Sequence, residues 1–407
     1  MMKIGLIKEG KIPTDTRVAL TPEQCLSLRE NFNQVELVVQ PSPNRSYHND
    51  EYLEAGIMMN EDVSDCDVLL GIKEVPIKDL IPNKTYFFFS HTKKKQSYNQ
   101  QLMKALIERK IRMIDYEALT YDNGKRIIGF GFFAGVVGAH NALLTFGKKY
   151  HQFDLKPAYQ CKDMLQMVAQ YQNIELPAVK IVVTGDGRVA HGIVHIMNAM
   201  NIIEVSPEEF LNTTYDVPVF TKLKNEHLYR NKRTQHYCRE EFHAHPELYE
   251  CLFTPYCSAD ILINGIYWDN NIPRLFEKYE VNNPDFNLSV IADVTCDKDG
   301  SVPINLGSSS IPDPVYGYNK QTGEMDLPFK NDPDIIDIMA VDNLPNELPR
   351  DASKVFGAHI LEFILPELLK AESAILERAT ICKNGELGTN FQYLEDYAFP
   401  EKHKSLS

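Results

Sequence analysis

Long apolar segments are missing from this sequence. Its 407 residues contain no run of 18 consecutive apolar residues, and the opening MMKIGLIKEG has neither the apolar core nor the cleavage site of a signal peptide. These absences argue against a membrane span and against secretion, so we expect a cytoplasmic chain with no membrane partner.

Metal-ligand spacings are missing as well. The eight cysteines form no CxxC pair and no regular framework, so reduced thiols are expected. The densest group of thiol and imidazole side chains matches no common zinc-ligand spacing; it comprises Cys238, His243, His245, Cys251 and Cys257. We therefore predict no metal site.

A basic stripe is also absent. The 42 lysines and arginines are scattered and outnumbered by 56 acidic residues, which gives a formal net charge of −14. This charge argues against a nucleic-acid partner, whereas a small-molecule ligand fits it. The chain is 43% hydrophobic and 24% charged, as soluble globular proteins are, and its length favours two domains.

The sequence does contain alternating apolar strands and amphipathic helices. Five early segments are typical of strands, KIGLIKEG, QVELVVQ, DVLLGI, TYFFFSH and RMIDYEAL, and helices are predicted in RVALTPEQCLSLREN and SYNQQLMKALIERK. This alternation predicts a mostly parallel sheet. The glycine-rich IIGFGFFAGVVGAHNALLTFGKKY predicts a buried helix that begins near Phe133, links two domains and uses small residues for close packing.

A second alternating region contains the predicted strands KIVVTG, ADILINGIYW and LSVIADVT. We therefore predict an α/β protein with two Rossmann-like domains, mostly parallel sheets and an interdomain cleft. The expected parts are a substrate and catalytic domain at 1–140, a dinucleotide-binding domain at 141–341, and C-terminal helices at 342–407. The C-terminal helices should pack back on the N-terminal domain, because an amphipathic helix must bury its apolar face.

The strongest motif is a glycine-rich turn between a strand and a helix. Gly185, Gly187 and Ala190 form G-x-G-x-x-A directly after KIVVT, and a further strand ends at Glu204, 19 residues after Gly185. Together these features are typical of a dinucleotide site: a tight turn, open backbone near the pyrophosphate, helix N-terminal amides, and a carboxylate for the ribose. The alternative is a plain strand–helix turn without a ligand.

The choice of coenzyme depends on charges near this turn. Glu204 would bind a ribose 2′-hydroxyl and repel a 2′-phosphate, which favours NAD over NADP. Arg188, inside the loop beside Val189, either contacts a phosphate or lies on the surface.

Ionisable residues follow the strands of the first domain. Lys73 and Glu74 follow VLLGI, His91 follows TYFFFS, and Glu117 follows RMIDY. Because ligands bind at the carboxyl ends of parallel strands, these side chains are predicted to converge, with Lys73 or His91 acting as acid or base. The alternative for Lys73 and Glu74 is an exposed ion pair at a strand end.

Two guanidinium groups complete the predicted site. Arg17 precedes VALTP and Arg126 precedes IIGFG, and each offers a fork that binds a carboxylate through two hydrogen bonds. The run Lys93 to Lys95 is predicted to be a solvated turn without chemistry.

At the level of families, the opening IGLIKEGKIPTDTRVALTP resembles the start of the alanine dehydrogenase and transhydrogenase superfamily. A more specific resemblance, over nearly the whole chain, is to lysine-forming saccharopine dehydrogenase and to the lysine-ketoglutarate reductase half of aminoadipic semialdehyde synthase. The segments that carry it are GIKEVP, YFFFSHTKKKQ, RMIDYEAL, GKRIIGFGFFAG, ADILINGIYW, IADVT and AVDNLPNELPRDAS.

This resemblance implies a pyridine-nucleotide enzyme that joins the ε-amine of lysine to 2-oxoglutarate through an imine, or splits the product, saccharopine. It implies that Lys73 is the acid/base for imine formation and hydrolysis and that His91 handles the secondary amine proton. Glu74 and Glu117 would tune Lys73 and meet the substrate amine, and the two arginines would hold substrate carboxylates. Further residues resemble those lining the cofactor and the interdomain cleft: Asn264, Ile266, Tyr267, Asp293, Val294, Asp342, Asn343 and Leu344.

Several alternatives stay open at this point. The segment from Ser206 to Cys257 resembles the reductase half, a branch associated with NADPH, so the coenzyme is NAD or NADP with NAD slightly favoured. A chain of 407 residues leaves no room for the second, glutamate-forming half, and one activity is expected. The other functions considered are an alanine dehydrogenase-like amino-acid dehydrogenase and a non-catalytic nucleotide-binding regulator. We expect a monomer or a small homo-oligomer.

Overall fold

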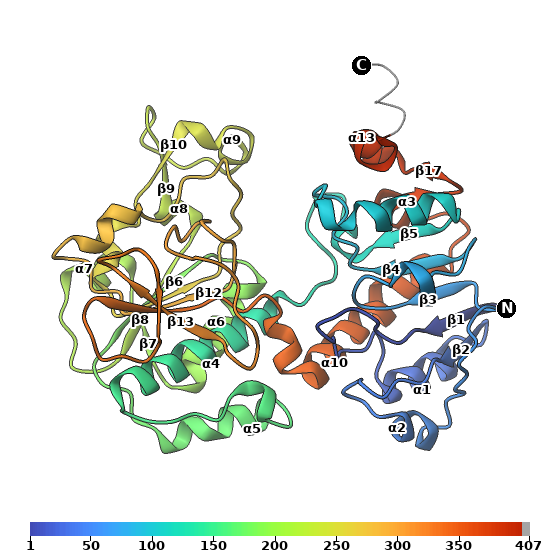
Figure 1. The fold of residues 1–407 in the computed structure, drawn as a ribbon, viewed down its shortest axis with the longest axis horizontal. Helices are drawn as coiled ribbons and strands as arrows, with labels where there is room; N and C mark the ends of the chain where they lie inside the picture. Colours follow the sequence, from blue (N-terminus) through green and yellow to red (C-terminus); the bar gives the residue numbers. More distant parts are fainter. Residues whose placement is uncertain (401–407) are drawn as a thin grey trace. The chain divides into compact units, whose positions relative to one another are not determined.

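The computed structural model describes residues 1–400, and the chain divides into two units (Figure 1). The first unit comprises Met1–Gly129 with the chain from Pro349 onward, and the second comprises Phe130–Leu348. From the sequence, these divisions are expected at residues 140 and 341. Because the division falls at Gly129, the whole of helix α4 (Gly131–Tyr150) belongs to the second unit.

A seven-stranded sheet forms the centre of the first unit, in the order β17-β16-β5-β4-β3-β1-β2. Strands β1 to β5 pair in parallel, which confirms the predicted parallel sheet. Most of their residues are buried, as is usual for parallel strands. The bounds are β1 (Met2–Leu6), β2 (Val35–Val39), β3 (Val68–Leu70), β4 (Thr85–Phe88), β5 (Arg112–Asp115), β16 (Thr380–Lys383) and β17 (Glu386–Leu387).

Helices of the first unit come from both ends of the chain. Helix α1 (Pro22–Asn31) begins at a capping box, in which Gln24 N donates to Thr21 Oγ1 at 3.3 Å and Thr21 N donates to Gln24 Oε1 at 3.0 Å. The other helices are α2 (Asn49–Glu54), α3 (Gln100–Glu108), α10 (Pro349–His359), α11 (Leu365–Leu368), α12 (Ala374–Ala379) and α13 (Glu395–Ala398). Helix α3 was predicted from its apolar spacing, and five of its nine residues are buried.

The C-terminal segment extends the first sheet, a feature that the sequence analysis did not predict. Strand β16 pairs antiparallel with β5, and β17 pairs antiparallel with β16. Asn384 and Gly385 make the turn between them with φ of 55° and 89°, as a two-residue hairpin requires. Ile381 and Leu394 lie in one apolar cluster with Phe88 of β4, so this segment also contributes to the core of the first unit.

An eight-stranded sheet forms the centre of the second unit, in the order β14-β13-β15-β12-β11-β6-β8-β7. The neighbouring strands β15, β12, β11, β6, β8 and β7 all pair in parallel. Strand β13 pairs antiparallel with β15 on one side and with β14 on the other. The bounds are β6 (Lys180–Thr184), β7 (Ile203–Glu204), β8 (Val219–Leu223), β11 (Ile261–Asn264), β12 (Val290–Asp293), β13 (Val315–Asn319), β14 (Met325–Asp326) and β15 (Ile335–Met339). A separate hairpin pairs β9 (Tyr229–Asn231) with β10 (Tyr249–Cys251).

The predicted glycine-rich helix is α4, and it packs against α6 (Arg188–Ala199), as Figure 1 shows. A Cβ atom added to Gly135 would overlap the Val189 carbonyl, and one added to Gly192 would overlap the Phe132 carbonyl. Only glycine permits so close a helix crossing, so the prediction of a buried helix with close backbone approach is confirmed. The shorter helices of this unit are α5 (Met164–Ala169), α7 (Pro207–Asn212), α8 (Asn225–Leu228) and α9 (Arg239–Ala244).

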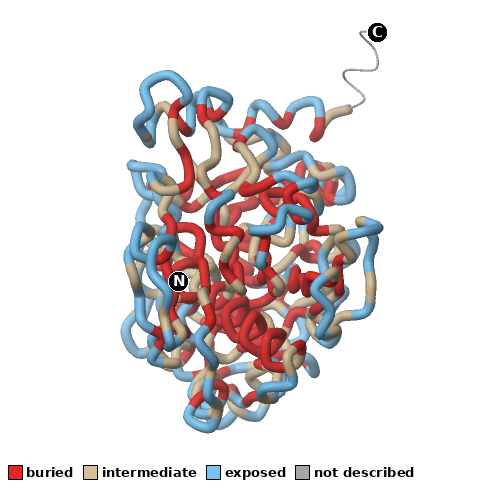
Figure 2. The backbone as a smooth tube through the Cα atoms, turned by 90° about the vertical axis from the view of Figure 1, so that its left-hand side faces the viewer, coloured by how far each residue is buried: buried red, intermediate tan, exposed pale blue. Residues whose placement is uncertain are grey.

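Burial follows the two sheets. Figure 2 shows buried backbone in the interior and exposed backbone at the connections. Within the part of the chain that the structure describes, none of the helices has both the length and the apolar character needed to cross a bilayer.

Candidate functional site

Charged residues lie just beyond the carboxyl ends of neighbouring strands in the first unit. Lys73 and Glu74 follow β3, His91 follows β4, and Glu117 follows β5. These strands are adjacent and parallel, so their carboxyl ends share one edge of the sheet. His91 has a left-handed backbone conformation with φ 51°, which is uncommon for a residue other than glycine and often found at functional sites.

Glu74 is the centre of this cluster. Its buried carboxylate accepts hydrogen bonds from His91 Nδ1 at 2.6 Å, Lys11 Nζ at 3.0 Å and Asn99 Nδ2 at 3.2 Å. Burial disfavours the charged form, but the bonds and charge of His91 and Lys11 outweigh it and lower the pKa of Glu74 to about 2. Glu74 is therefore not an exposed partner at a strand end, and it fixes the imidazole of His91.

Lys73 is held by its backbone and perturbed by its surroundings. Its N–H donates to Glu9 Oε2 at 2.8 Å, and the N–H of Ile72 donates to Glu9 Oε1 at 2.7 Å. Desolvation and the positive charge of Arg17 lower the pKa of the Lys73 ammonium. The pKa of Glu9 itself is raised to about 8 by burial and by the negative charge of Asp15.

Arg17 is buried and paired with a carboxylate of this chain. Its Nε lies 2.9 Å from Asp15 Oδ1, and its Nη2 lies 2.5 Å from Asp15 Oδ2. This edge of the guanidinium fork is therefore directed at Asp15, whereas the sequence analysis predicted that the fork holds a substrate.

A pocket of about 220 Å³ joins several predicted residues of the first unit. Arg126 Nη2 donates to Glu117 Oε1 at 3.0 Å on one of its walls. The lining residues are Phe89, His91, Lys94, Gln96, Glu117 and Arg126. Lys94 thus lines the same pocket as His91, whereas the sequence predicts a solvated turn without chemistry there.

Four residues near the cluster were missed by the sequence analysis: Glu9, Lys11, Asp15 and Asn99. The first three follow β1 in IKEGKIPTD, so the rule that singled out Lys73 could have found them. Asn99 comes from the turn before α3, and no sequence signal points to it.

The glycine-rich turn of the second unit has the geometry that a dinucleotide needs. Gly185 has φ 103°, and a Cβ there would lie 2.6 Å from the Gly265 carbonyl oxygen. At Gly187 an added Cβ meets no protein atom within 4 Å, so this backbone is open to a ligand. Helix α6 then begins at Arg188, and the N-cap residue Gly187 has no side chain to cap it, so the positive end of the helix dipole lies at this open backbone. The turn therefore fits the pyrophosphate of a dinucleotide.

The other predicted cofactor residues lie at the carboxyl ends of β11, β12 and β15. The side chains of Asn264 and Asp293 are fully buried and bond to one another, with Nδ2 of Asn264 2.8 Å from Oδ1 of Asp293. Thr184 and Asn305 complete this network at 2.6 and 2.8 Å. The two side chains therefore fix the strand ends to one another and do not face solvent.

The remaining members of that set differ in exposure. Ile266 and Leu344 are buried, Val294 and Asn343 are half-buried, and Asp342 and Tyr267 are exposed. Of the loop residues, Ala190 is buried, and Arg188 and Val189 are half-buried.

The structure does not place Glu204 where a ribose carboxylate is needed. Glu204 lies on the edge strand β7, and β8 separates it from β6. It is level with Phe220 and hence with Ile181, four residues before Gly185. Two strand spacings of ~4.8 Å and four residues of ~3.3 Å put it roughly 16 Å from the turn, too far to bind the ribose.

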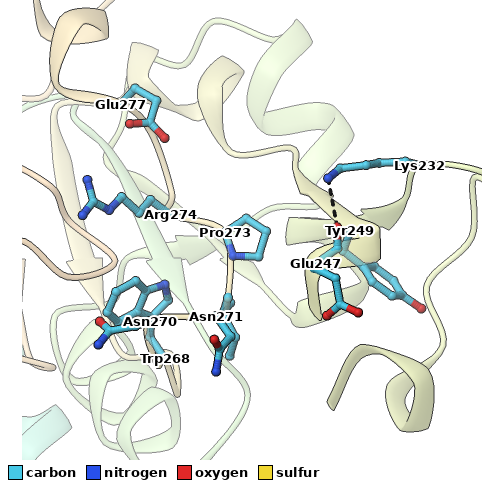
Figure 3. Close-up of a pocket in the computed structure, with 10 residues that line it drawn as sticks. Lys232, Glu247, Tyr249, Trp268, Asn270, Asn271, Pro273, Arg274 and Glu277 are labelled. Carbon is cyan, nitrogen blue, oxygen red and sulfur yellow. Dashed lines mark hydrogen bonds between the residues drawn. The ribbon is translucent and has the colours of Figure 1, made fainter. Parts of the chain in front are cut away.

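A larger pocket, of about 600 Å³, lies elsewhere in the second unit (Figure 3). Lys232 Nζ donates to the Glu247 carbonyl at 3.0 Å on one side of it, and Trp268 and Arg274 line the other. None of the predicted site residues lines this pocket. Among residues 1–400, no three His, Cys, Asp or Glu side chains gather as a metal site would need.

Solved structures identify the fold class. The chain is similar to an L-alanine dehydrogenase, with a TM-score of 0.63 and 17% identity over 98% of this chain and 99% of that one. It is also similar to a transhydrogenase from Sinorhizobium meliloti, with a TM-score of 0.57 and 14% identity over 95% and 98% of the two chains. At such identities the likeness shows the fold alone, which is a two-domain Rossmann-type α/β fold.

Sequence comparisons confirm the resemblance inferred from the motifs. A family model described as alanine dehydrogenase/PNT, N-terminal domain, matches residues 5–137. A saccharopine dehydrogenase [NAD(+), L-lysine-forming] of Emericella nidulans is 27% identical over 94% of this chain and 95% of its own length. Alpha-aminoadipic semialdehyde synthases are 27% identical in Arabidopsis thaliana and 28% in Mus musculus, each over 96% of this chain. The chain spans only 41% and 47% of the lengths of these two synthases.

Proposed function

We propose that this chain is an NAD(P)-dependent oxidoreductase of the saccharopine dehydrogenase (L-lysine-forming) or lysine-ketoglutarate reductase type, acting on a C–N bond through an imine. The substrate would be saccharopine, or lysine plus 2-oxoglutarate. The observation that carries the proposal is the cluster of Lys73, Glu74 and His91 at adjacent strand ends, in a chain whose second unit has a turn suited to a dinucleotide. An L-lysine-forming saccharopine dehydrogenase and an alpha-aminoadipic semialdehyde synthase match over nearly the whole chain, which supports the proposal.

Lys73 is proposed as the acid/base for imine formation and hydrolysis. Burial and Arg17 lower the pKa of its ammonium, which makes the neutral amine accessible closer to physiological pH. The Glu9 carboxyl group accepts the N–H of Lys73 and of its neighbour Ile72 and so fixes the backbone that carries the amine. Glu9 is therefore a positioning residue in this proposal.

His91 is proposed to handle the proton of the secondary amine. Its Nδ1 is bonded to the ionised Glu74, so Nδ1 carries a proton and Nε2 is the atom that exchanges one with a substrate. The pocket that His91 lines contains the guanidinium of Arg126, a partner for a substrate carboxylate, and Glu117, a partner for a substrate amine.

The dinucleotide would supply or accept the hydride. Gly185, Gly187 and the first amides of α6 would hold its pyrophosphate, with Arg188, Val189 and Ala190 completing the turn. Other contacts are proposed from the residues beyond β11, β12 and β15, namely Ile266, Tyr267, Val294, Asp342, Asn343 and Leu344. A cytoplasmic location and a monomer or small homo-oligomer remain predictions.

One assay separates the candidate functions. The absorbance of reduced nicotinamide is followed with lysine plus 2-oxoglutarate and with pyruvate plus ammonia, each with NADH and NADPH. Lysine-dependent oxidation supports the proposal, whereas oxidation with pyruvate and ammonia selects an alanine dehydrogenase-like enzyme, the fold relative in the structure comparison. If no mixture reacts although a coenzyme binds, the chain is a nucleotide-binding regulator and the proposal is wrong.

A further inference from the structure

The end of strand β8 occupies the position from which a dinucleotide fold recognises the adenosine ribose. That position is the end of the strand beside the first strand of the fold. Here the first strand is β6, and β8 lies beside it. Strand β7, which follows α6 in the chain, lies one position further out at the sheet edge. Gly185 N donates to the Leu223 carbonyl at 2.8 Å, so the last residue of β8 touches the glycine-rich turn.

Two lysines stand at this strand end. Lys222 Nζ lies 3.4 Å from Asp186 Oδ1, a carboxylate within the turn. Lys224 is the first residue after β8, and its φ of −80° and ψ of 169° continue the extended backbone. Alternate residues of an extended chain share a face, so Lys224 is on the same face as Lys222. Lys224 N donates to His227 Nδ1 at 3.2 Å, which fixes its backbone.

The local charges determine which coenzyme this strand end suits. NAD-specific folds place an aspartate or glutamate here, which binds both ribose hydroxyls and repels a phosphate. Lys224 reverses that charge. Its contact with Glu226, at 3.9 Å between side chains that are 44% and 58% exposed, is weak enough for a phosphate to replace. The negative charge of Asp186 is balanced by Lys222.

We propose that Lys224 binds the 2′-phosphate of NADP(H), while Lys222 offsets the negative charge of the nearby Asp186. On this proposal the chain prefers NADPH to NADH. The inference rests on the dinucleotide site of the proposed function and reverses the preference for NAD drawn from Glu204. An ammonium is a compact charge that binds phosphate without a fixed fork geometry, so its exposed position does not prevent the contact.

Binding without turnover tests this inference. Isothermal titration calorimetry of the full chain with NADPH, NADH, 2′,5′-ADP and 5′-AMP measures how much the 2′-phosphate contributes to the affinity. The first two ligands test it in whole coenzymes, and the last two in fragments. We expect the phosphorylated ligand of each pair to bind about 10- to 100-fold more tightly, as one charge-assisted contact allows. This advantage should shrink at high salt, because the contact is partly exposed.

Variants assign the preference to a residue. Lys224→Asp should remove the advantage of NADPH and leave NADH binding unchanged or improved, and Lys224→Arg should retain it. Glu204→Gln is the matched control and should alter neither coenzyme, because its strand is remote from the turn. Tighter binding of NADH by the wild type, or loss of NADH binding in Glu204→Gln, would overturn the inference while leaving the proposed function intact. If the folded chain binds none of the four ligands, the proposed function fails, and the inference fails with it.

Discussion

Replacing Glu74 by glutamine tests the electrostatic centre of the candidate site. The hydrogen bonds and charges around this carboxylate lower its pKa from 4.5 to about 2. A folded-state pKa below the unfolded value means that ionised Glu74 stabilises the fold above pH 4.5 and loses this effect as the pH falls toward 2. Each tenfold change in proton affinity corresponds to 1.4 kcal/mol, so the effect amounts to about 3 kcal/mol at pH 7.

Glu74→Gln retains the shape of the side chain but not its charge. We expect the variant to lose about 3 kcal/mol of local stability at pH 7 and only about 1.4 kcal/mol at pH 3, because Glu74 of the unfolded chain is already protonated at pH 3. The single tryptophan, Trp268, belongs to the second unit, so its fluorescence does not report on this site. Amide hydrogen exchange of peptides covering β3 and β4 measures the opening free energy directly.

The control is Asp396→Asn, which removes an exposed ion pair with Lys95 in the same unit. Its effect should be too small to resolve, as is usual for exposed pairs. Equal losses for Glu74→Gln at pH 7 and pH 3, or no loss at pH 7, would refute the assignment of Glu74 as a buried, stabilised carboxylate.

Three further predictions concern the turn, the proposed acid/base and a buried carboxyl. Gly187→Val should leave the melting temperature nearly unchanged but abolish coenzyme binding by calorimetry, because a Cβ there meets no protein atom within 4 Å and the side chain fills the space over the open backbone; unchanged affinity would contradict the turn assignment. Lys73→Met should lower turnover by about 10²- to 10⁴-fold with coenzyme affinity intact, and Lys78→Met, on the exposed side of the following turn, should not; equal rates would remove Lys73 from the chemistry. Glu347 is 1% exposed, and burial raises its pKa to about 8 although Asn141 donates a hydrogen bond to it. Because the folded-state pKa lies above the unfolded value of 4.5, the folded state becomes less stable as the pH rises from 4.5 through 8. Glu347→Gln should therefore gain on the order of 4 kcal/mol relative to wild type between pH 5 and pH 9 in denaturant titrations followed by Trp268 fluorescence, and a constant difference would show that Glu347 is ionised throughout.

The sequence predicted the elements whose signal is local. Strands β1 to β5 are short apolar runs, and α4 has a long apolar pattern with interspersed glycines, so both were found. The hairpin of β16 and β17 was missed because its strands have only four and two residues, although the Asn384-Gly385 dipeptide at its turn was a usable signal.

Strand order was the part that the sequence could not supply. Spacing along the chain put Glu204 at the correct interval after Gly185, but only the hydrogen-bonded register shows that β8 comes between β7 and β6. Side-chain partners were hidden in the same way. Glu74 was singled out for its place after β3, whereas the bond from Asn99, 25 residues further along the chain, depends on how the turn before α3 packs.

The extension of the first sheet by β16 also bears on how the protein is made. Arg112 Nε of β5 donates to Thr380 Oγ1, 268 residues further along the chain. During translation, β5 is therefore an open sheet edge until the ribosome has released β16, by which time the whole of the second unit, Phe130–Leu348, has been synthesised and can fold. Nascent or truncated chains that end before Thr380 would therefore leave the β5 edge unpaired, and an unpaired strand edge can pair with other chains.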